Sequence, residues 1–142
     1  MTVARRPARP PVRVLLVDDS PWQREGWAVL FGSQPDLEVV GQAGDGTQAL
    51  TQARKQLVDV VLMDIQMPRV NGFVATARIL GDAKVLANGP APRVILVTGV
   101  DLDEHVAAAA EAGAFAMLYK DAEPEALFDA IREAANARSV VE

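Results

Sequence analysis

Apolar residues gather in five short runs along the chain, and polar or turn-forming residues bound each run. The runs are Val12 to Val17, Leu37 to Ala43, Asp59 to Met63, Arg93 to Val97 and Ala114 to Tyr119. Short apolar runs rich in β-branched residues are typical of strands buried in a sheet. We therefore predict five buried strands.

Between these runs, apolar residues recur at helical spacing. Ser20 can cap a helix that starts at Pro21, and Gln23 follows Ser20 by three residues, as in a capping box. Gly32 and Pro35 end this pattern, which predicts a helix from Pro21 to Phe31. Further helices are predicted from the Gly44-Asp45-Gly46 turn to about Leu57, from Phe73 to Leu80, from Asp103 to Ala112 and from Pro124 to Ala137.

Strand and helix alternate strictly through the chain, and the connections between them are short. Parallel strands need a crossover, and the helices of right-handed crossovers cover both faces of the sheet. The predicted fold class is therefore α/β, a doubly wound parallel sheet of five strands. In such sheets ligands bind beyond the carboxyl ends of the strands, where the strand order reverses.

The composition limits the chemistry that the chain can carry. Its 142 residues, half of them apolar, are enough for one ordinary domain. The absence of Cys excludes disulfides, thiolate metal sites and cysteine nucleophiles. With no Cys in the chain, a cytosolic location is the simplest expectation. No apolar run approaches the roughly 20 residues that span a bilayer, and no targeting segment is recognised.

Charge is distributed unevenly along the chain. The net charge is −5, but the first 13 residues hold four Arg and no acid, so the remainder has a charge of −9. Residues 1–11 are rich in Pro and Arg and are expected to form a disordered tail without a function of its own. The folded domain is predicted over 12–138, and 139–142 as a tail or the start of a linker. An acidic domain of this kind repels phosphate backbones and binds nucleic acid poorly by itself.

Polar residues follow four of the predicted strands directly. Asp18 and Asp19 follow the first, Asp64 the third, Thr98 the fourth and Lys120 the fifth. Each has an ordinary explanation when taken alone, since acidic pairs cap helices and a Lys or Thr at a strand end is usually a surface residue. Because the fold brings all five to one rim of the sheet, we favour a functional site.

The residue types at this rim suit phosphoryl chemistry. Three clustered carboxylates repel one another unless a cation lies among them, and oxygen ligands without His or Cys select Mg²⁺. Mg²⁺ of this kind usually shares a phosphate oxygen, and a carboxylate such as Asp64 can attack phosphorus to form an aspartyl phosphate. Lys120 and the Thr98 hydroxyl could then bind the phosphoryl oxygens.

From Val12 to Ala137 the sequence resembles the receiver domains of bacterial two-component response regulators. The segment Val14-Leu15-Leu16-Val17-Asp18-Asp19-Ser20 is similar to the family's first strand and acidic pair. Leu62-Met63-Asp64-Ile65-Gln66-Met67-Pro68 with Asn71-Gly72 is similar to its phosphorylation segment. Thr98 and Lys120 follow in the family's order. The Gly44-Asp45-Gly46 turn and Lys120-Asp121-Ala122 most resemble the NarL/FixJ (LuxR-type) branch.

This resemblance implies a flavodoxin-like (βα)5 sheet of order 2-1-3-4-5. It also implies that Asp64 accepts phosphate from a sensor histidine kinase. Mg²⁺ would be bound by Asp19, Asp64 and the backbone carbonyl of Gln66, with Asp18 acting through water. Thr98 and Lys120 would bind the phosphoryl group.

The resemblance also implies an output. The fourth helix, fifth strand and fifth helix would rearrange or form a homodimer, and transcription would be regulated through a C-terminal DNA-binding domain that this chain does not contain. No membrane partner is implied.

Two features depart from the family pattern. The family's switch aromatic lies three residues before the lysine, where this chain has Met117, so the switch pair would be Thr98 and Met117. Met is flexible and could fill the same pocket, but it offers no ring or hydroxyl. The connection from Gly81 to Pro92 is long and is predicted to be a solvated loop.

Two other functions stay open. The chain could be a small Mg²⁺-dependent phosphohydrolase with Asp64 as nucleophile, although such enzymes usually place an acid/base carboxylate where this chain has Gln66. It could also be an inert receiver-like scaffold. We expect a phosphoacceptor switch that is not a turnover enzyme beyond its own phosphorylation and dephosphorylation. His105 is expected on a solvent-facing helix edge, and of Trp22 and Trp27 one is expected to be buried and the other at most partly exposed.

Overall fold

The computed structural model describes residues 9–141, and their side chains as far as Ala137. Most of the expected tail, residues 1–8, lies outside the described residues, as does residue 142. The last helix continues to Val141, past the expected domain boundary at 138.

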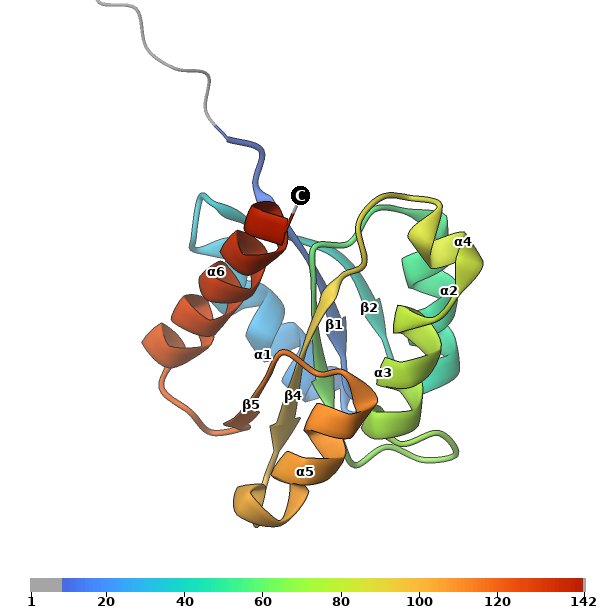
Figure 1. Cartoon of the computed structure of the whole chain (residues 1–142). Coiled ribbons are helices and arrows are strands. Elements are labelled where there is room, and N and C mark those ends of the chain that lie inside the picture. The colour runs from blue at the N-terminus through green and yellow to red at the C-terminus, as the bar shows by residue number, and fades with distance from the viewer. Residues whose placement is uncertain (1–8, 142) are drawn as a thin grey trace, which may run out of the picture.

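The sheet has the predicted architecture (Figure 1). Five parallel strands lie in the order β2-β1-β3-β4-β5, so the doubly wound, flavodoxin-like fold is confirmed. The strands are β1 Val12–Val17, β2 Leu37–Ala43, β3 Val60–Asp64, β4 Arg93–Thr98 and β5 Ala116–Tyr119. The reversal of strand order falls between β1 and β3, which places the carboxyl ends of these strands at the expected ligand rim.

Helices cover both faces of the sheet. They are α1 Pro21–Gly32, α2 Gly46–Lys55, α3 Gly72–Leu80, α4 Ala83–Leu86, α5 Leu102–Ala112 and α6 Pro124–Val141. The apolar residues of α1 and α6 pack with alternate residues of β1, β3 and β4 on one side, and those of α2, α3 and α5 pack on the other. Among the described helices, none is both long and apolar enough to cross a membrane.

The core lies on the three central strands, as their apolar sequences predict. Val14 to Val17 and Val60 to Met63 are completely buried. On the α1 and α6 side, the Phe31 and Phe128 rings meet edge to face with centroids 5.8 Å apart, which closes that half of the core.

The local signals for α1 are confirmed, with two corrections. Ser20 caps the helix by accepting a hydrogen bond from the Gln23 amide at 3.3 Å. The reciprocal half of the capping box is absent, because the Ser20 amide donates to Asp18 instead. Trp27 is buried as expected, whereas Trp22 is 86% exposed, so the prediction of at most partial exposure was wrong.

The connection from Gly81 to Pro92 is not the solvated loop that its composition predicts. It contains α4, capped by Asp82, whose carboxylate accepts from the amides of Lys84 and Val85. Asn88 Nδ2 donates to the carbonyl oxygens at the end of α2, at 2.9 Å for Ala53. The segment is thus folded onto α2 and satisfies α2's terminal carbonyl groups.

Candidate functional site

The fold brings the predicted site residues to the carboxyl ends of four strands. Asp18 follows the last residue of β1, Asp64 and Thr98 are the last residues of β3 and β4, and Lys120 follows β5. Asp18, Asp64 and Thr98 are buried and Asp19 is exposed. The rim predicted from the sequence is therefore present, although its members differ in what they contact.

Three carboxylates form the centre of the site. Asp18, Asp19 and Asp64 each have an oxygen within 4.8 Å of the other two. Lys120 Nζ lies 2.8 Å from Asp18 Oδ2 and 3.0 Å from Asp64 Oδ2, so a single ammonium bridges the two buried acids. Because three negative charges face one positive charge, the cluster retains a net negative charge.

The environment shifts the pKa values of two of these groups. Burial raises the pKa of Asp64 above its ordinary value, and the charge of Asp18 adds to this, against the hydrogen bonds from Gln66 and Lys120. Burial acts to lower the pKa of Lys120, but the contacts with Asp18 and Asp64 outweigh it and the pKa is raised. Lys120 therefore stays an ammonium, and Asp64 is a carboxylate held in an unfavourable site.

Asp18 is the most constrained of the acids. Its Oδ1 accepts from the Ser20 amide at 2.8 Å, which fixes the turn into α1. Its buried Oδ2 has the Lys120 ammonium as an ion-pair partner at 2.8 Å, and no other donor among the described residues hydrogen-bonds to it. This oxygen therefore keeps a lone pair that a second cation could use.

Arg24 contributes to this rim but was not predicted from the sequence. Its Nη1 donates to the Asp18 carbonyl oxygen at 2.6 Å, and its Nε donates to Gln42 at 3.3 Å. The guanidinium thus ties the turn after β1 to β2. A lone Arg within a helix gives no sequence signal for such a contact.

Gly72 has a structural requirement that the Asn71-Gly72 motif alone did not explain. A Cβ atom at Gly72 would lie 2.6 Å from the carbonyl oxygen of Asp64 and 2.7 Å from Cα of Ile65. The Gly72 amide donates to the Ile65 carbonyl at 3.0 Å, which holds α3 against the end of β3. Only glycine allows this approach. Gln66 is held beside the acids in turn, because its amide donates to Asp64 Oδ1 at 3.0 Å.

The Thr98 hydroxyl is occupied within its own loop. It donates to the Val100 carbonyl oxygen at 2.7 Å and accepts from the Val100 amide at 3.3 Å. Asp101, the next residue, has a left-handed backbone with φ of 53° and caps α5 without a side-chain hydrogen bond. Thr98 is therefore at the expected rim, but its hydroxyl bonds to the loop and not to the acidic cluster.

Residues near the predicted switch have distinct surroundings. Met117 is partly buried against the core beneath α3 and α5, where the family aromatic was expected. Tyr119, two residues further along the strand and so on the same face, is 43% exposed. His105 is less exposed than predicted, because its ring lies 5.9 Å from that of Phe73.

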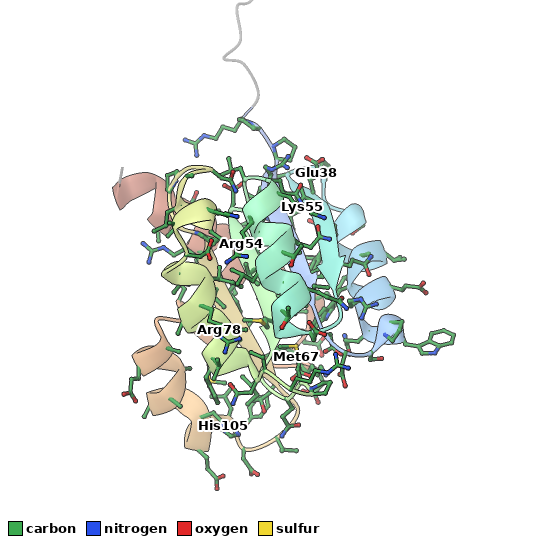
Figure 2. All side chains as sticks on the ribbon, turned by 90° about the vertical axis from the view of Figure 1, so that its right-hand side faces the viewer. Glu38, Arg54, Lys55, Met67, Arg78 and His105 are labelled. Atoms are coloured by element: carbon green, nitrogen blue, oxygen red, sulfur yellow. The ribbon has the colours of Figure 1, made fainter. Side chains whose placement is uncertain are left out.

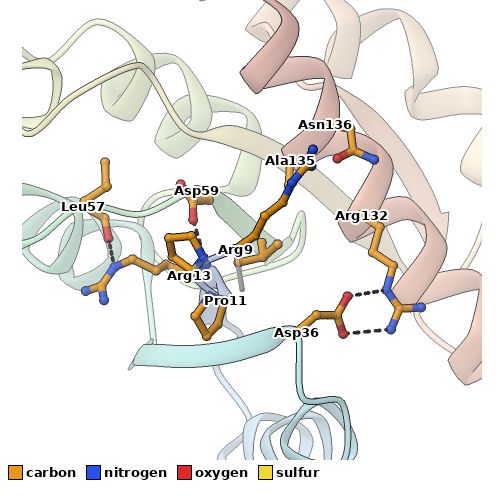
Figure 3. A pocket seen from close by; sticks show the side chains of 11 residues that line it. Arg9, Pro11, Arg13, Asp36, Leu57, Asp59, Arg132, Ala135 and Asn136 are labelled. Atoms are coloured by element: carbon orange, nitrogen blue, oxygen red, sulfur yellow. Dashed lines mark hydrogen bonds and ion pairs between the residues drawn. The ribbon is translucent and has the colours of Figure 1, made fainter. Parts of the chain in front are cut away.

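A pocket of about 570 Å³ lies at the opposite end of the sheet, between the start of β1 and α6 (Figure 3). Two of its arginines are already engaged. Arg132 pairs with Asp36 at 2.8 Å, and Arg13 donates to the Leu57 carbonyl at 2.7 Å. The pocket contains none of the rim residues.

The acidic rim, Lys120 and the sheet order together are those of a known domain. The chain matches the response regulator receiver domain family over residues 14–132. It is a response regulator receiver domain.

This receiver domain is similar to NarL-type proteins. It is 39% identical over 129 residues to the uncharacterized transcriptional regulatory protein YxjL of Bacillus subtilis, covering 91% of this chain and 56% of YxjL. It is 35% identical over 134 residues to the nitrate/nitrite response regulator protein NarP of Escherichia coli, covering 94% of this chain and 60% of NarP. The signal receiver domain of NarL from Mycobacterium tuberculosis has a TM-score of 0.79 and 30% identity, covering 90% of this chain and 98% of that one.

The chain spans about three fifths of the length of the curated relatives that it matches. Membership of the family places it in two-component signalling. The activity of the remaining part of those relatives is known only for them, and it is attributed to this protein only as a proposal.

Proposed function

We propose that this receiver domain accepts a phosphoryl group on Asp64 from a sensor histidine kinase and changes conformation in response. The observation that carries the proposal is the position of Asp64, which is buried in an acidic cluster with Lys120 Nζ 3.0 Å from one oxygen. Phosphorylation of Asp64 adds negative charge to the cluster. The Lys120 ammonium is already beside Asp64 and can neutralise part of that charge, so this carboxylate is suited to act as the nucleophile.

The residues of the cluster fit a Mg²⁺ ion. Asp18, Asp19 and Asp64 offer oxygens within 4.8 Å of one another, and among the described residues the buried Asp18 Oδ2 has only the Lys120 ammonium beside it. Hard divalent cations prefer such oxygen ligands. The exposed Asp19 and the backbone carbonyl of Gln66 would complete the protein's share of ligands. When bound, Mg²⁺ supplies positive charge to the phosphoryl oxygens.

The phosphoryl transfer involves Asp64 as nucleophile and Lys120 as a fixed cation. An oxygen of Asp64 attacks phosphorus, the bond between phosphorus and the histidine nitrogen of the donor breaks, and its electron pair stays with the nitrogen. Lys120, held as an ammonium, neutralises a phosphoryl oxygen of the product. For this it turns from the Asp64 carboxylate, to which it is now bound, toward the new group.

The response would pass through Thr98 and Met117. A phosphoryl oxygen is a stronger acceptor than the Val100 carbonyl, so the Thr98 hydroxyl would exchange its bond to Val100 for one to the phosphoryl group. This would release the loop that leads to α5. The loop ends at Asp101, the N-cap of α5, whose backbone is left-handed. Met117, packed beneath α5, would adjust to the shift without the ring that the family usually has at this position.

The output would lie on α5, β5 and α6, which are the fourth helix, fifth strand and fifth helix expected from the sequence. The relatives YxjL and NarP are named as a transcriptional regulatory protein and a response regulator, which supports transcription regulation through a further domain. A homodimer through this face stays a prediction.

One experiment separates the switch from its alternatives. The protein is incubated with Mg²⁺ and acetyl phosphate, and its intact mass and the free phosphate are followed with time. A lasting adduct that Asp64→Asn abolishes supports the switch. Rapid phosphate release without an adduct would indicate a phosphohydrolase, and no reaction would indicate an inert scaffold.

A further inference from the structure

The loop between β3 and α3, residues 65–71, carries an arginine at the rim of the acidic cluster. Within the five described loops that follow the strands, only Arg69 and Lys120 are basic. Lys120 is bound by Asp18 and Asp64 and its side chain is 25% exposed, whereas the side chain of Arg69 is 81% exposed. Arg69 is therefore the cation of these loops that an approaching molecule meets first.

Arg69 joins two loops that lie on either side of the end of β1. Its Nη1 is 3.4 Å from Asp45 Oδ2, in the loop after β2. In the sheet order β2-β1-β3, the loops after β2 and β3 flank the carboxyl end of β1, where Asp18 and Asp19 lie. The Asp18 amide donates to the Ala43 carbonyl oxygen at 3.1 Å, which keeps the loop after β2 next to the acidic pair. The guanidinium thus lies at the border of the acidic cluster.

The fold itself gains little from an arginine at this position. The backbone of Arg69 is left-handed, with φ of 68°, a conformation that costs free energy for most side chains and that Gly or Asn adopts more easily. The ion pair with Asp45 offsets little of this cost, because a pair with so exposed a side chain is weak. Asp45 does not need the pair either, since its Oδ1 caps α2 by accepting from the Gln48 amide at 2.8 Å. A strained residue that packing does not require is a candidate for a functional role.

The acidic cluster needs positive charge to receive an anion. Three carboxylates face the Lys120 ammonium there, so the field at the rim repels a phosphodonor, whose phosphoryl group is itself anionic. Bound Mg²⁺ would bring the sum of these charges only to zero. A guanidinium presents a planar fork that can bind two phosphoryl oxygens together, and Arg69 can exchange its weak pair with Asp45 for such an anion.

We propose that Arg69 is a specificity-determining residue for anionic phosphodonors, a role that rests on the proposed function of Asp64. Its guanidinium leaves Asp45, hydrogen-bonds to the phosphoryl oxygens of the incoming donor and guides phosphorus toward Asp64. The exchange breaks and makes only hydrogen bonds and ion pairs. Arg69 therefore changes how readily a donor is captured and leaves the chemistry of the transfer unchanged.

The test compares two variants that break the same ion pair. Arg69→Gln removes the cation, whereas Asp45→Asn removes its partner and keeps an oxygen to cap α2. Labelling by acetyl phosphate with Mg²⁺ is followed by intact mass over a range of donor concentrations at low salt. We expect Arg69→Gln to have an about 5- to 10-fold lower kcat/KM, through a higher KM and with the maximum rate retained. Asp45→Asn should be labelled at least as fast as the wild type, because its Arg69 is free.

Matched controls separate the position of the charge from its amount. Arg69→Lys keeps the cation and should recover most of the rate. Lys55→Gln makes the same change of net charge at the last residue of α2 and should leave the rate unchanged. Figure 2 shows Lys55 at the opposite end of the α2 face from Met67, which belongs to the same loop as Arg69.

The charge of the medium and of the donor gives a second readout. High salt should reduce the defect of Arg69→Gln to less than about 2-fold, because salt screens exposed charges. Phosphoramidate, which carries less net negative charge than acetyl phosphate, should also show a smaller defect. A purely structural effect of Arg69 would depend on neither salt nor donor, so a defect that is constant across them would overturn the proposal.

Three other results would overturn it. Equal losses in Arg69→Gln and Asp45→Asn would show that the ion pair only holds the loop. Equal losses in Arg69→Gln and Lys55→Gln would show that only total charge matters. If the wild type and Arg69→Gln are labelled equally fast, Arg69 has no such role and the proposed function of Asp64 still holds. A wild type that forms no adduct would contradict the proposed function itself, and this inference with it.

Discussion

The Thr98 hydroxyl donates to the carbonyl oxygen of Val100, two residues further along the same loop, at 2.7 Å. The residue expected to bind the phosphoryl group is thus engaged with the segment that leads into α5. Because one donor cannot serve both acceptors, capture of a phosphoryl oxygen by Thr98 must break its bond to the Val100 carbonyl oxygen.

Thr98→Val therefore tests the link between the site and α5. The change keeps the shape but removes the hydroxyl, so the Val100 amide loses its acceptor. A hydrogen bond contributes roughly 0.5–1.5 kcal/mol, so hydrogen exchange at Val100 should become about 2- to 10-fold faster. Beryllofluoride with Mg²⁺ should produce a similar increase in the wild type if the loop moves away once the Thr98 hydroxyl turns to the phosphoryl mimic and its bond to the Val100 carbonyl is broken. Thr98→Ser, which retains the donor, is the control, and unchanged exchange in Thr98→Val would refute the link.

Asp64→Asn should stabilise the fold in Mg²⁺-free buffer. Burial and the charge of Asp18 raise the pKa of Asp64, so the carboxylate disfavours the native state at pH values above its raised pKa. An amide removes this penalty, and the midpoint of urea unfolding at neutral pH should rise.

Added Mg²⁺ should reverse that order. A ligand at about 100 times its Kd stabilises the native state by about 2.7 kcal/mol, and the wild type should gain most of this. Asp64→Asn lacks one ligand and should gain less. Equal stabilisation of both proteins would show that Asp64 does not bind the ion.

Gly72→Ala should disrupt the end of β3. Its Cβ would lie 2.6 Å from the Asp64 carbonyl oxygen, a backbone atom that cannot move without moving the phosphoacceptor. Overpacking of this kind costs roughly 1–3 kcal/mol, and acetyl phosphate labelling should fall with it. Gly26→Ala is the matched control, because nothing lies within 4 Å of a Cβ there and α1 should gain about 0.5–1 kcal/mol. A harmless Gly72→Ala would contradict the close approach.

Asp82 and Arg54 should make the attachment of α4 depend on pH. The Arg54 guanidinium lowers the pKa of Asp82 from 3.8 to about 2. A lowered carboxyl pKa stabilises the native state above about pH 4, and this contribution is lost as the pH falls toward 2. Asp82→Asn, which keeps an oxygen to cap α4, should be less stable than the wild type at neutral pH. The difference should shrink as the pH falls from about 4 through 2, and a difference that does not depend on pH would exclude the ion pair as its cause.

The strand ends were the most predictable part of the molecule. Apolar β-branched runs predicted the five strands, and Asp18, Asp64, Thr98 and Lys120 all lie at the rim that the parallel fold implies. The sequence could not predict which atom each of these polar side chains hydrogen-bonds to. The Thr98 hydroxyl bonds to Val100 because of the loop's conformation, and Arg24 reaches Asp18 across a turn that no periodicity describes.

The segment 81–92 shows why composition misled. A loop was predicted because the segment contains Gly81, Gly89, Pro90 and Pro92. The helix-capping signal of Asp82 received too little weight beside them. The decisive contact, from Asn88 to the end of α2, joins residues more than 30 positions apart. Such tertiary capping has no local signature.

The central claim, that Asp64 is the phosphoacceptor, is tested most directly by locating the phosphoryl group. After reaction with acetyl phosphate and Mg²⁺, borohydride reduces an aspartyl phosphate to homoserine, which peptide fragmentation can place in the sequence. We predict homoserine at position 64 and nowhere else in the acidic cluster. Homoserine at Asp18 or Asp19, or none in a protein that has gained the mass of a phosphoryl group, would contradict the account.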